Sequence, residues 1–380
     1  MRITAPTETA PGETRVALVP RSATQLVATG ATVAIQAGAG TAAGITDAAY
    51  VEVGAEVAAD RAALLTDADI VVVVRRPDVA FVSQLKRGAI LVGVLEPAGD
   101  PALLRALVDG GITAFRLEAM PRISRAQDMD VLSSMATLAG YHAAVIAAVR
   151  LPRIFPLMMT AAGTITPARA LILGAGVAGL QAIATCRRLG AVVEAFDVRP
   201  AVRDQVESLG ARFVETGVES DTQQDTGGYA RELEADAQAR QAAVLAEHVK
   251  ESDVVISTAQ IPNRKAPILV TAAMVATMRT GSVIVDLAAP GGGNCELTQP
   301  DEEVNANGVL ILGPTNLPAA IPGQASQLYS HNATRFLAQM LKDGAVHLDF
   351  DDVVISQTCI SHEGKAMGEQ MEALLQGTTA

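Results

Sequence analysis

Three glycines and one acid in the middle of the chain have the types and spacing of a ligand-binding turn. Gly174, Gly176 and Gly179 form the pattern G-x-G-x-x-G, and Asp197 lies about twenty residues further on. The first glycine permits a tight turn, the second lets the backbone approach a pyrophosphate, and the third lets a helix pack closely on a strand. An acid at this position accepts both hydroxyls of an adenosine ribose and repels a 2′-phosphate, which favours NAD over NADP. The spacing predicts dinucleotide binding; a glycine-rich turn that only packs is the alternative.

The residues around these glycines predict the elements that position them. Ala170–Leu173 is a short apolar run typical of a buried strand, Val177–Leu189 has the pattern of a helix, and Val192–Phe196 is a second apolar run. The N-terminus of such a helix presents unpaired N–H groups and a partial positive charge to phosphates. Arg199 follows shortly after the acid and can stack on an adenine or pair with a phosphate instead.

A second group of polar residues precedes the glycine turn in the chain. If a helix begins near Ala126, then Gln127, Asp130 and Ser133 share one face, because residues three apart are neighbours on a helix. Arg122 lies outside that helix and can fold back toward the acid. An amide satisfies a nicotinamide carboxamide or a ribose hydroxyl, and an Arg–Asp pair holds a neighbouring group at a fixed angle. The alternative is a solvated helix start with an ordinary ion pair.

Two further segments have the character of binding loops. Tyr229 follows Gly227 and Gly228 at the end of a polar segment, so the tyrosine either closes over a bound cofactor or caps a helix. The glycine-rich segment Ala288–Cys295 follows an apolar run, and ligands bind at strand ends of this kind in open parallel sheets.

The composition narrows the class of protein. The chain has 380 residues, 49% of them hydrophobic but only 3% aromatic, which fits strands of Val and Ile between Ala-rich helices. A net charge of −12 argues against nucleic acid as a partner. The cysteines and histidines lack metal-ligand spacing, so we expect no metal site and no disulfide. No signal peptide and no run of eighteen apolar residues is found, so no membrane span is expected.

Strand and helix patterns alternate over residues 1–118 and again after residue 160, which predicts an α/β fold. We expect two Rossmann-like parallel-sheet domains with a cleft between them. The first is an N-terminal α/β domain of residues 1–137 with a C-terminal return of residues 322–380. The second is an NAD-binding domain of residues 138–321.

The segment PRISRAQDMDVLSSMATLAGY resembles the NAD(H)-binding component, domain I, of proton-translocating NAD(P) transhydrogenase. The segments PTETAPGETRVALVP, FDVRPAVRDQVESLGARFVE and SQTCISHEGKA, and the stretch around the glycine turn, extend the resemblance over nearly the whole chain. In this family the domain is related in fold to alanine dehydrogenase.

The resemblance also implies the role of each site residue. The nicotinamide and its ribose are held by Arg122, Ile123, Ser124, Gln127, Asp130 and Ser133. The pyrophosphate lies on Gly174, Ala175, Gly176, Val177 and Gly179, and the adenosine ribose on Asp197, Val198 and Arg199. A mobile loop contributes Gly228 and Tyr229, and Gln241 and Gln260 lie near the cofactor.

The family's chemistry is direct hydride transfer from NADH, bound here, to NADP⁺ held on a partner domain, with proton translocation by membrane subunits. Such a site must position the reacting carbons at roughly 3–3.5 Å and needs no strong acid or base. Because the chain ends at Ala380 with no hydrophobic helices, we expect a separate first subunit. The resemblance implies a homodimer that is cytoplasmic and peripheral on the inner membrane through its partners.

Two other functions remain as alternatives. An alanine dehydrogenase needs a lysine and a histidine beside its substrate, and neither occurs in Val71–Pro77 or Leu91–Ala98, where Val73 replaces the expected lysine. A catalytically silent NAD-binding sensor is the third interpretation, and the complete polar group from Arg122 to Ser133 argues against it.

Overall fold

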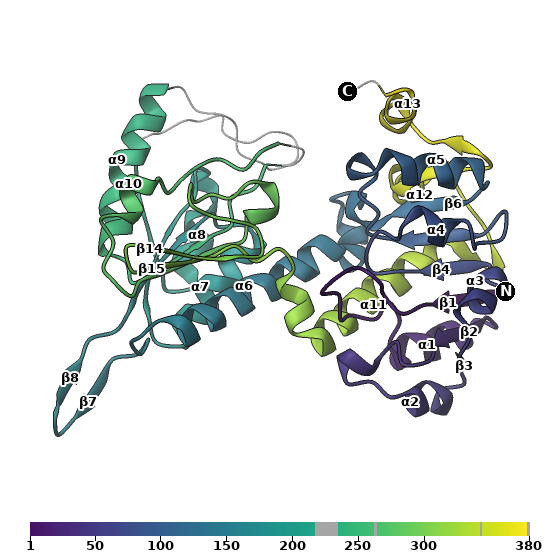
Figure 1. The fold of residues 1–380 in the computed structure, drawn as a ribbon, viewed down its shortest axis with the longest axis horizontal. Coiled ribbons are helices and arrows are strands. Elements are labelled where there is room, and N and C mark those ends of the chain that lie inside the picture. The colour runs from purple at the N-terminus through teal and green to yellow at the C-terminus, as the bar shows by residue number, and fades with distance from the viewer. Residues whose placement is uncertain (217–234, 262–263, 343, 378–380) are drawn as a thin grey trace. The chain divides into compact units, whose positions relative to one another are not determined.

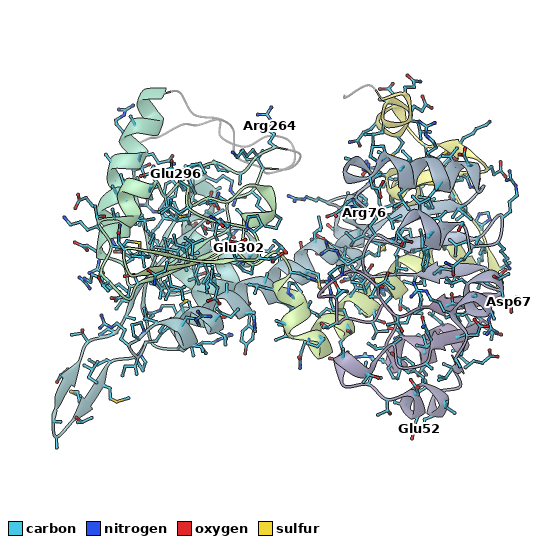
Figure 2. The ribbon with its side chains drawn as sticks, in the orientation of Figure 1. Glu52, Asp67, Arg76, Arg264, Glu296 and Glu302 are labelled. Atoms are coloured by element: carbon cyan, nitrogen blue, oxygen red, sulfur yellow. The ribbon has the colours of Figure 1, made fainter. Side chains whose placement is uncertain are left out.

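The computed structural model describes residues 1–216, 235–261, 264–342 and 344–377. The chain divides into two compact units (Figure 1). Unit 1 consists of Met1–Met135 and Ala319–Ala380, and unit 2 of Ala136–Pro318. Each unit has its own sheet with helices against it, and charged side chains such as those of Glu52 and Glu302 lie at the surface (Figure 2).

Unit 1 is built on an eight-stranded sheet in the order β19-β18-β6-β5-β4-β1-β2-β3. The strands from β6 to β3 in this order are parallel, while β18 pairs antiparallel with both β6 and β19. The strands are β1 (Arg2–Ala5), β2 (Thr32–Gln36), β3 (Glu56–Ala58), β4 (Ile70–Val72), β5 (Ile90–Gly93), β6 (Thr113–Arg116), β18 (Cys359–His362) and β19 (Lys365–Ala366).

The helices of unit 1 leave both faces of this sheet buried. They are α1 (Pro20–Val27), α2 (Asp47–Glu52), α3 (Arg61–Thr66), α4 (Val79–Val82), α5 (Pro101–Asp109), α11 (Pro322–Met340), α12 (Val353–Thr358) and α13 (Glu369–Gln376). Successive residues of β4 alternate between two cores: Ile70 and Val72 belong to the core that contains α11 residues, and Val71 to the core that contains α5 residues. This two-sided burial explains why the strands are continuous apolar runs.

Unit 2 contains a seven-stranded sheet in the order β11-β10-β9-β12-β13-β15-β14. The strands are β9 (Arg169–Leu173), β10 (Val192–Phe196), β11 (Arg212–Phe213), β12 (Val254–Ser257), β13 (Val283–Asp286), β14 (Glu303–Ala306) and β15 (Val309–Leu312), and β14 alone is antiparallel to its neighbour. Without β14, this is the 3-2-1-4-5-6 strand order of a Rossmann sheet. The α/β prediction with two parallel-dominated sheets is therefore confirmed.

The remaining elements of unit 2 are the helices and a hairpin. The helices are α7 (Val177–Arg188), α8 (Arg203–Ser208), α9 (Ala235–Glu251), α10 (Ala272–Val275) and most of α6 (Val131–Arg150), which begins in unit 1. Strands β7 (Met158–Thr160) and β8 (Gly163–Ile165) form an antiparallel hairpin whose residues are all exposed and which projects from its unit (Figure 1).

One helix among the described residues, α6, has the length and mean hydropathy of a membrane span, contrary to the sequence expectation. This criterion is weak evidence, because core helices of water-soluble proteins also meet it. Ala143, Ala144 and Ala147 of α6 are fully buried in the core of unit 2, so part of the helix serves as packing surface for that core.

Candidate functional site

The glycine turn of unit 2 has the backbone that its sequence predicts. Gly174 follows β9 with φ of +97°, a conformation that favours glycine. A Cβ built on Gly174 would lie 2.6 Å from Oγ1 of Thr258, which donates a hydrogen bond to the Gly174 carbonyl at 3.0 Å. The turn is therefore tied to the end of β12, the neighbour of β9 at the point where the strand order reverses.

The other two glycines play different structural parts. A Cβ on Gly179 would lie 1.8 Å from the carbonyl oxygen of Gly174, so only glycine allows α7 to approach the turn this closely. Gly176 is the N-cap of α7, and a Cβ there would meet no atom within 4 Å. The start of α7, including the exposed Val177, is thus open to an anionic ligand.

Asp197, just after β10, is fully engaged by protein donors. Its Oδ2 accepts hydrogen bonds from the Ala175 N–H at 2.8 Å and from Nη2 of Arg199 at 2.9 Å. Its Oδ1 accepts from the main-chain N–H and from Nε of Arg199, both at 2.9 Å. Four donors fill the roughly four acceptor positions of a carboxylate. The sequence assigned Arg199 to an adenine or a phosphate, whereas in this structure its guanidinium occupies the acid.

A buried acid that the sequence analysis did not select organises the neighbouring loop. Asp286, at the end of β13, is fully buried and accepts hydrogen bonds from Ser257 Oγ, from Thr298 Oγ1 and from the main-chain N–H groups of Asn294 and Cys295, at 2.7–2.9 Å. The side chain of Asn294 in turn bonds both main-chain groups of Ala259. The signal for this network was the glycine-rich segment itself, which these bonds hold against the end of β12.

The remaining predicted residues of unit 2 are placed as follows. Val198 is half-buried, and Gln241 is buried on α9. Gln260 is exposed and donates from Nε2 to the Leu287 carbonyl at 2.9 Å. Gly228 and Tyr229 lie outside the described residues.

The polar group of unit 1 does not form the single helix face that its spacing predicts. Ser124–Met129 is a 3₁₀ helix, Asp130 is extended with ψ of 94°, and α6 begins at Val131. Asp130 breaks the helix because it acts as the cap of α6: its Oδ1 accepts from the Ser133 N–H at 2.9 Å and its Oδ2 from Ser133 Oγ at 2.6 Å. Asp130 and Ser133 are therefore brought together.

Burial separates the residues of this 3₁₀ turn into two sets. Ala126 and Met129 are buried in the core of unit 1. Arg122, Ile123, Ser124 and Gln127 are exposed. The turn is thus rooted in the core and presents its polar side chains outward.

A carboxylate that the sequence did not indicate lies at the carboxyl ends of β1 and β4. Glu8 accepts the main-chain N–H groups of Val74 and Arg75 at 2.7 and 3.1 Å. Burial raises the pKa of Glu8 from its ordinary value of 4.5 to about 7, although these two N–H groups oppose the shift.

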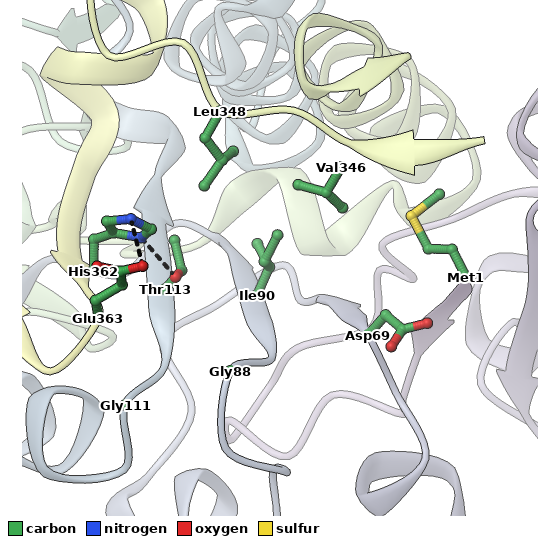
Figure 3. Close-up of a pocket in the computed structure, with 10 residues that line it drawn as sticks. All are labelled: Met1, Asp69, Gly88, Ile90, Gly111, Thr113, Val346, Leu348, His362 and Glu363. Atoms are coloured by element: carbon green, nitrogen blue, oxygen red, sulfur yellow. Dashed lines mark hydrogen bonds and ion pairs between the residues drawn. The ribbon is translucent and has the colours of Figure 1, made fainter. Parts of the chain in front are cut away.

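A cavity of about 490 Å³ lies at the opposite, amino-terminal edge of the same sheet (Figure 3). Its polar groups bond to protein atoms: Asp69 accepts from Lys86 Nζ at 2.5 Å, and His362 Nδ1 lies 3.1 Å from Thr113 Oγ1. None of the sequence-predicted site residues lines it. No group of three or more His, Cys, Asp or Glu in the described part of the chain is placed to hold a metal ion.

Comparisons with known proteins agree with this architecture. Residues 4–139 match the family described as alanine dehydrogenase/PNT, N-terminal domain, and residues 143–369 match alanine dehydrogenase/PNT, C-terminal domain. The first of the separate pieces of NAD(P) transhydrogenase subunit alpha in Rhodospirillum rubrum is 44% identical over 372 residues, which cover 96% of this chain and 97% of that protein. Alanine dehydrogenase of Mycobacterium tuberculosis is 30% identical over 381 residues, covering 98% and 96%.

A solved structure supports the same grouping. The crystal structure of transhydrogenase from Sinorhizobium meliloti has a TM-score of 0.88 and 42% identity, and the match covers 97% of this chain and 100% of that one. The resemblance to transhydrogenase that the motifs indicated is confirmed. The chain belongs to the alanine dehydrogenase/PNT family.

Proposed function

We propose that this chain is the NAD(H)-binding component of a proton-translocating transhydrogenase. The observation that carries the proposal is the turn after β9, in which Gly174 and Gly179 hold the backbone and Gly176 leaves the start of α7 open. A pyrophosphate fits there because the N–H groups at the start of a helix are unpaired donors with a partial positive charge. Ala175 and Val177 lie at the same turn, and the ribose is assigned to the Asp197–Arg199 segment.

The polar group of unit 1 is proposed to hold the nicotinamide and its ribose. Arg122, Ser124 and Gln127 are exposed donors and acceptors, and Asp130 and Ser133 are fixed to each other. These groups suit the orientation of a ring more than the removal of a proton. Direct transfer from C4 of NADH to C4 of a bound NADP⁺ requires orientation, which is where a protein contributes most to such a step.

The partners of this component are included in the proposal. Hydride passes to NADP⁺ on a second subunit, which regenerates NADPH, and membrane-spanning subunits carry the proton. The chain is then peripheral on the cytoplasmic face of the inner membrane. A homodimer is supported by the exposed apolar side chains of Leu157, Met159 and Ile165 on and beside the β7–β8 hairpin, since exposed apolar groups favour a protein contact.

Alanine dehydrogenase is the second candidate, favoured by the 30% identity over nearly the whole chain. The argument against it is chemical, because the segments Val71–Pro77 and Leu91–Ala98 contain neither lysine nor histidine. Val73, where a lysine is expected, is buried, and its carbonyl accepts a hydrogen bond from the Tyr329 hydroxyl at 2.6 Å.

One set of binding and turnover measurements separates these functions. Fluorescence titration with NADH and NADPH is followed by addition of L-alanine with NAD⁺, and then by NADH and NADP⁺ with an NADP(H)-binding transhydrogenase component. We expect NADH binding, no alanine turnover, and NADPH formation only with the partner. Alanine turnover would refute the proposal, and NADH binding with no transfer to the partner-bound NADP⁺ would favour a sensor.

A further inference from the structure

The 3₁₀ turn Ser124–Met129 is held from a distant segment of unit 1. On α11, Asn332 Nδ2 donates a hydrogen bond to the main-chain carbonyl of Asp128 at 2.7 Å. One helical turn further along, Arg335 Nε donates to Oδ2 of the same aspartate at 2.6 Å. Both the main chain and the side chain of Asp128 are therefore fixed by one helix.

The other end of the turn is fixed as well. The guanidinium of Arg125 donates to both carboxylate oxygens of Asp352, at 3.1 and 2.5 Å. Asp352 is itself held, because its Oδ1 accepts the Val354 N–H at the start of α12. Gln127 lies between the two anchored residues, and its side chain is exposed.

The anchors differ in how well they resist water. The Arg335–Asp128 and Arg125–Asp352 pairs are partly exposed, and such pairs hold geometry weakly. Asn332 is 3% exposed, and water has little access to its bond with the Asp128 carbonyl. Loss of this amide would leave a main-chain carbonyl without its donor immediately next to Gln127.

We propose that Asn332 is a positioning residue for hydride transfer, assisted by Arg335: it fixes the main chain at Asp128 and thereby the direction of the Gln127 amide. This inference rests on the proposed function, in which Gln127 orients the nicotinamide. A small rotation of that ring is costly, because transfer requires the two C4 atoms to be close and aligned. Asn332 itself does not touch the cofactor in this proposal.

Asn332→Leu tests the proposal, because leucine has a similar volume and lacks the amide. In the complex with the NADP(H)-binding partner, we expect kcat for hydride transfer to fall by about ten- to a hundredfold, with the Kd for NADH within about twofold of the original. Thr334→Val is the matched control: Thr334 is 5% exposed on the same helix, and its hydroxyl has no partner among the described residues. This control is expected to leave both quantities unchanged.

A second pair of variants decides the matter if Asn332→Leu does not fold. Arg335→Asp places two acids together and is expected to lower kcat, and adding Asp128→Arg restores the pair and some of the rate. Gln127→Asn in the same assay separates the two levels of the argument. If Gln127→Asn slows transfer while folded Asn332→Leu and Arg335→Asp do not, the positioning role is refuted and the proposed function stands. If Gln127→Asn also leaves the rate unchanged, the proposed role of the whole turn is refuted.

Discussion

Asp197→Ala is expected to weaken NADH binding and to reduce the discrimination against NADPH. In the free protein the acid accepts four hydrogen bonds, two of them from the Arg199 side chain. Ribose hydroxyls must therefore replace the guanidinium rather than occupy a vacant carboxylate. Alanine removes the acceptor and frees the Ala175 N–H, at a cost of about 1–3 kcal/mol, or about a five- to 150-fold rise in Kd.

Arg199→Ala is the informative companion, because it removes the competitor and keeps the acid. Both side chains are largely buried, so the exchange has a measurable cost. We expect NADH to bind about fivefold more tightly, which corresponds to about 1 kcal/mol for a charge-assisted hydrogen bond. NADPH is expected to bind more weakly, because the unneutralised carboxylate repels its 2′-phosphate. In Asp197→Ala the remaining guanidinium instead favours that phosphate.

The assay is nucleotide fluorescence titration of the original chain and both variants with NADH and NADPH. Asp197→Asn serves as the control for size, since it keeps one oxygen acceptor and loses the charge. Native NADH affinity in Asp197→Ala would show that the ribose is held elsewhere. Weaker NADH binding in Arg199→Ala would show that the guanidinium contributes to the bound state and is not a competitor.

Three further predictions concern the two turns and the buried acid. Gln127→Asn is expected to leave the Kd for NADH nearly unchanged and to slow hydride transfer sharply; unchanged turnover in the complex with the NADP(H) partner would remove its positioning role. Gly179→Ala is expected to lower Tm and abolish NADH binding, because its Cβ would lie 1.8 Å from the Gly174 carbonyl, whereas Gly176→Ala, in open space, is expected to keep Tm and weaken only the nucleotide. Equal Tm values for the two would contradict this. For Glu8, whose pKa of about 7 lies above its ordinary 4.5, the folded state binds the proton more tightly, so the free energy of unfolding falls as pH rises from about 4.5 to about 7. Glu8→Gln is expected to flatten that slope in urea titrations across this range, and an unaltered slope would contradict the assignment.

The sequence predicts those features that depend on local pattern. The β9 strand, the glycine turn, α7 and β10 follow from apolar runs separated by glycines, because a buried parallel strand must be apolar on both faces. Thr46 was identifiable as the cap of α2, and its hydroxyl accepts the Ala49 N–H. The roles of the predicted site residues stay predictions.

Features that depend on distant partners were not predictable. Helical spacing placed Gln127 and Asp130 on one helix, yet an aspartate three residues before a serine can equally end one element and cap the next. The donor that holds Asp128 is Asn332, 204 residues away. The capture of Asp197 by Arg199 depends on a rotamer that composition does not specify.

The most direct test of the central claim is the formation of NADPH when this chain, loaded with NADH, is mixed with an NADP(H)-binding transhydrogenase component holding NADP⁺. We predict transfer that requires both proteins, that does not occur with either alone, and that is slowed by Gln127→Asn. If NADH binds and the partner binds but no NADPH forms, or if the chain alone reduces NAD⁺ with L-alanine, the proposed function is contradicted.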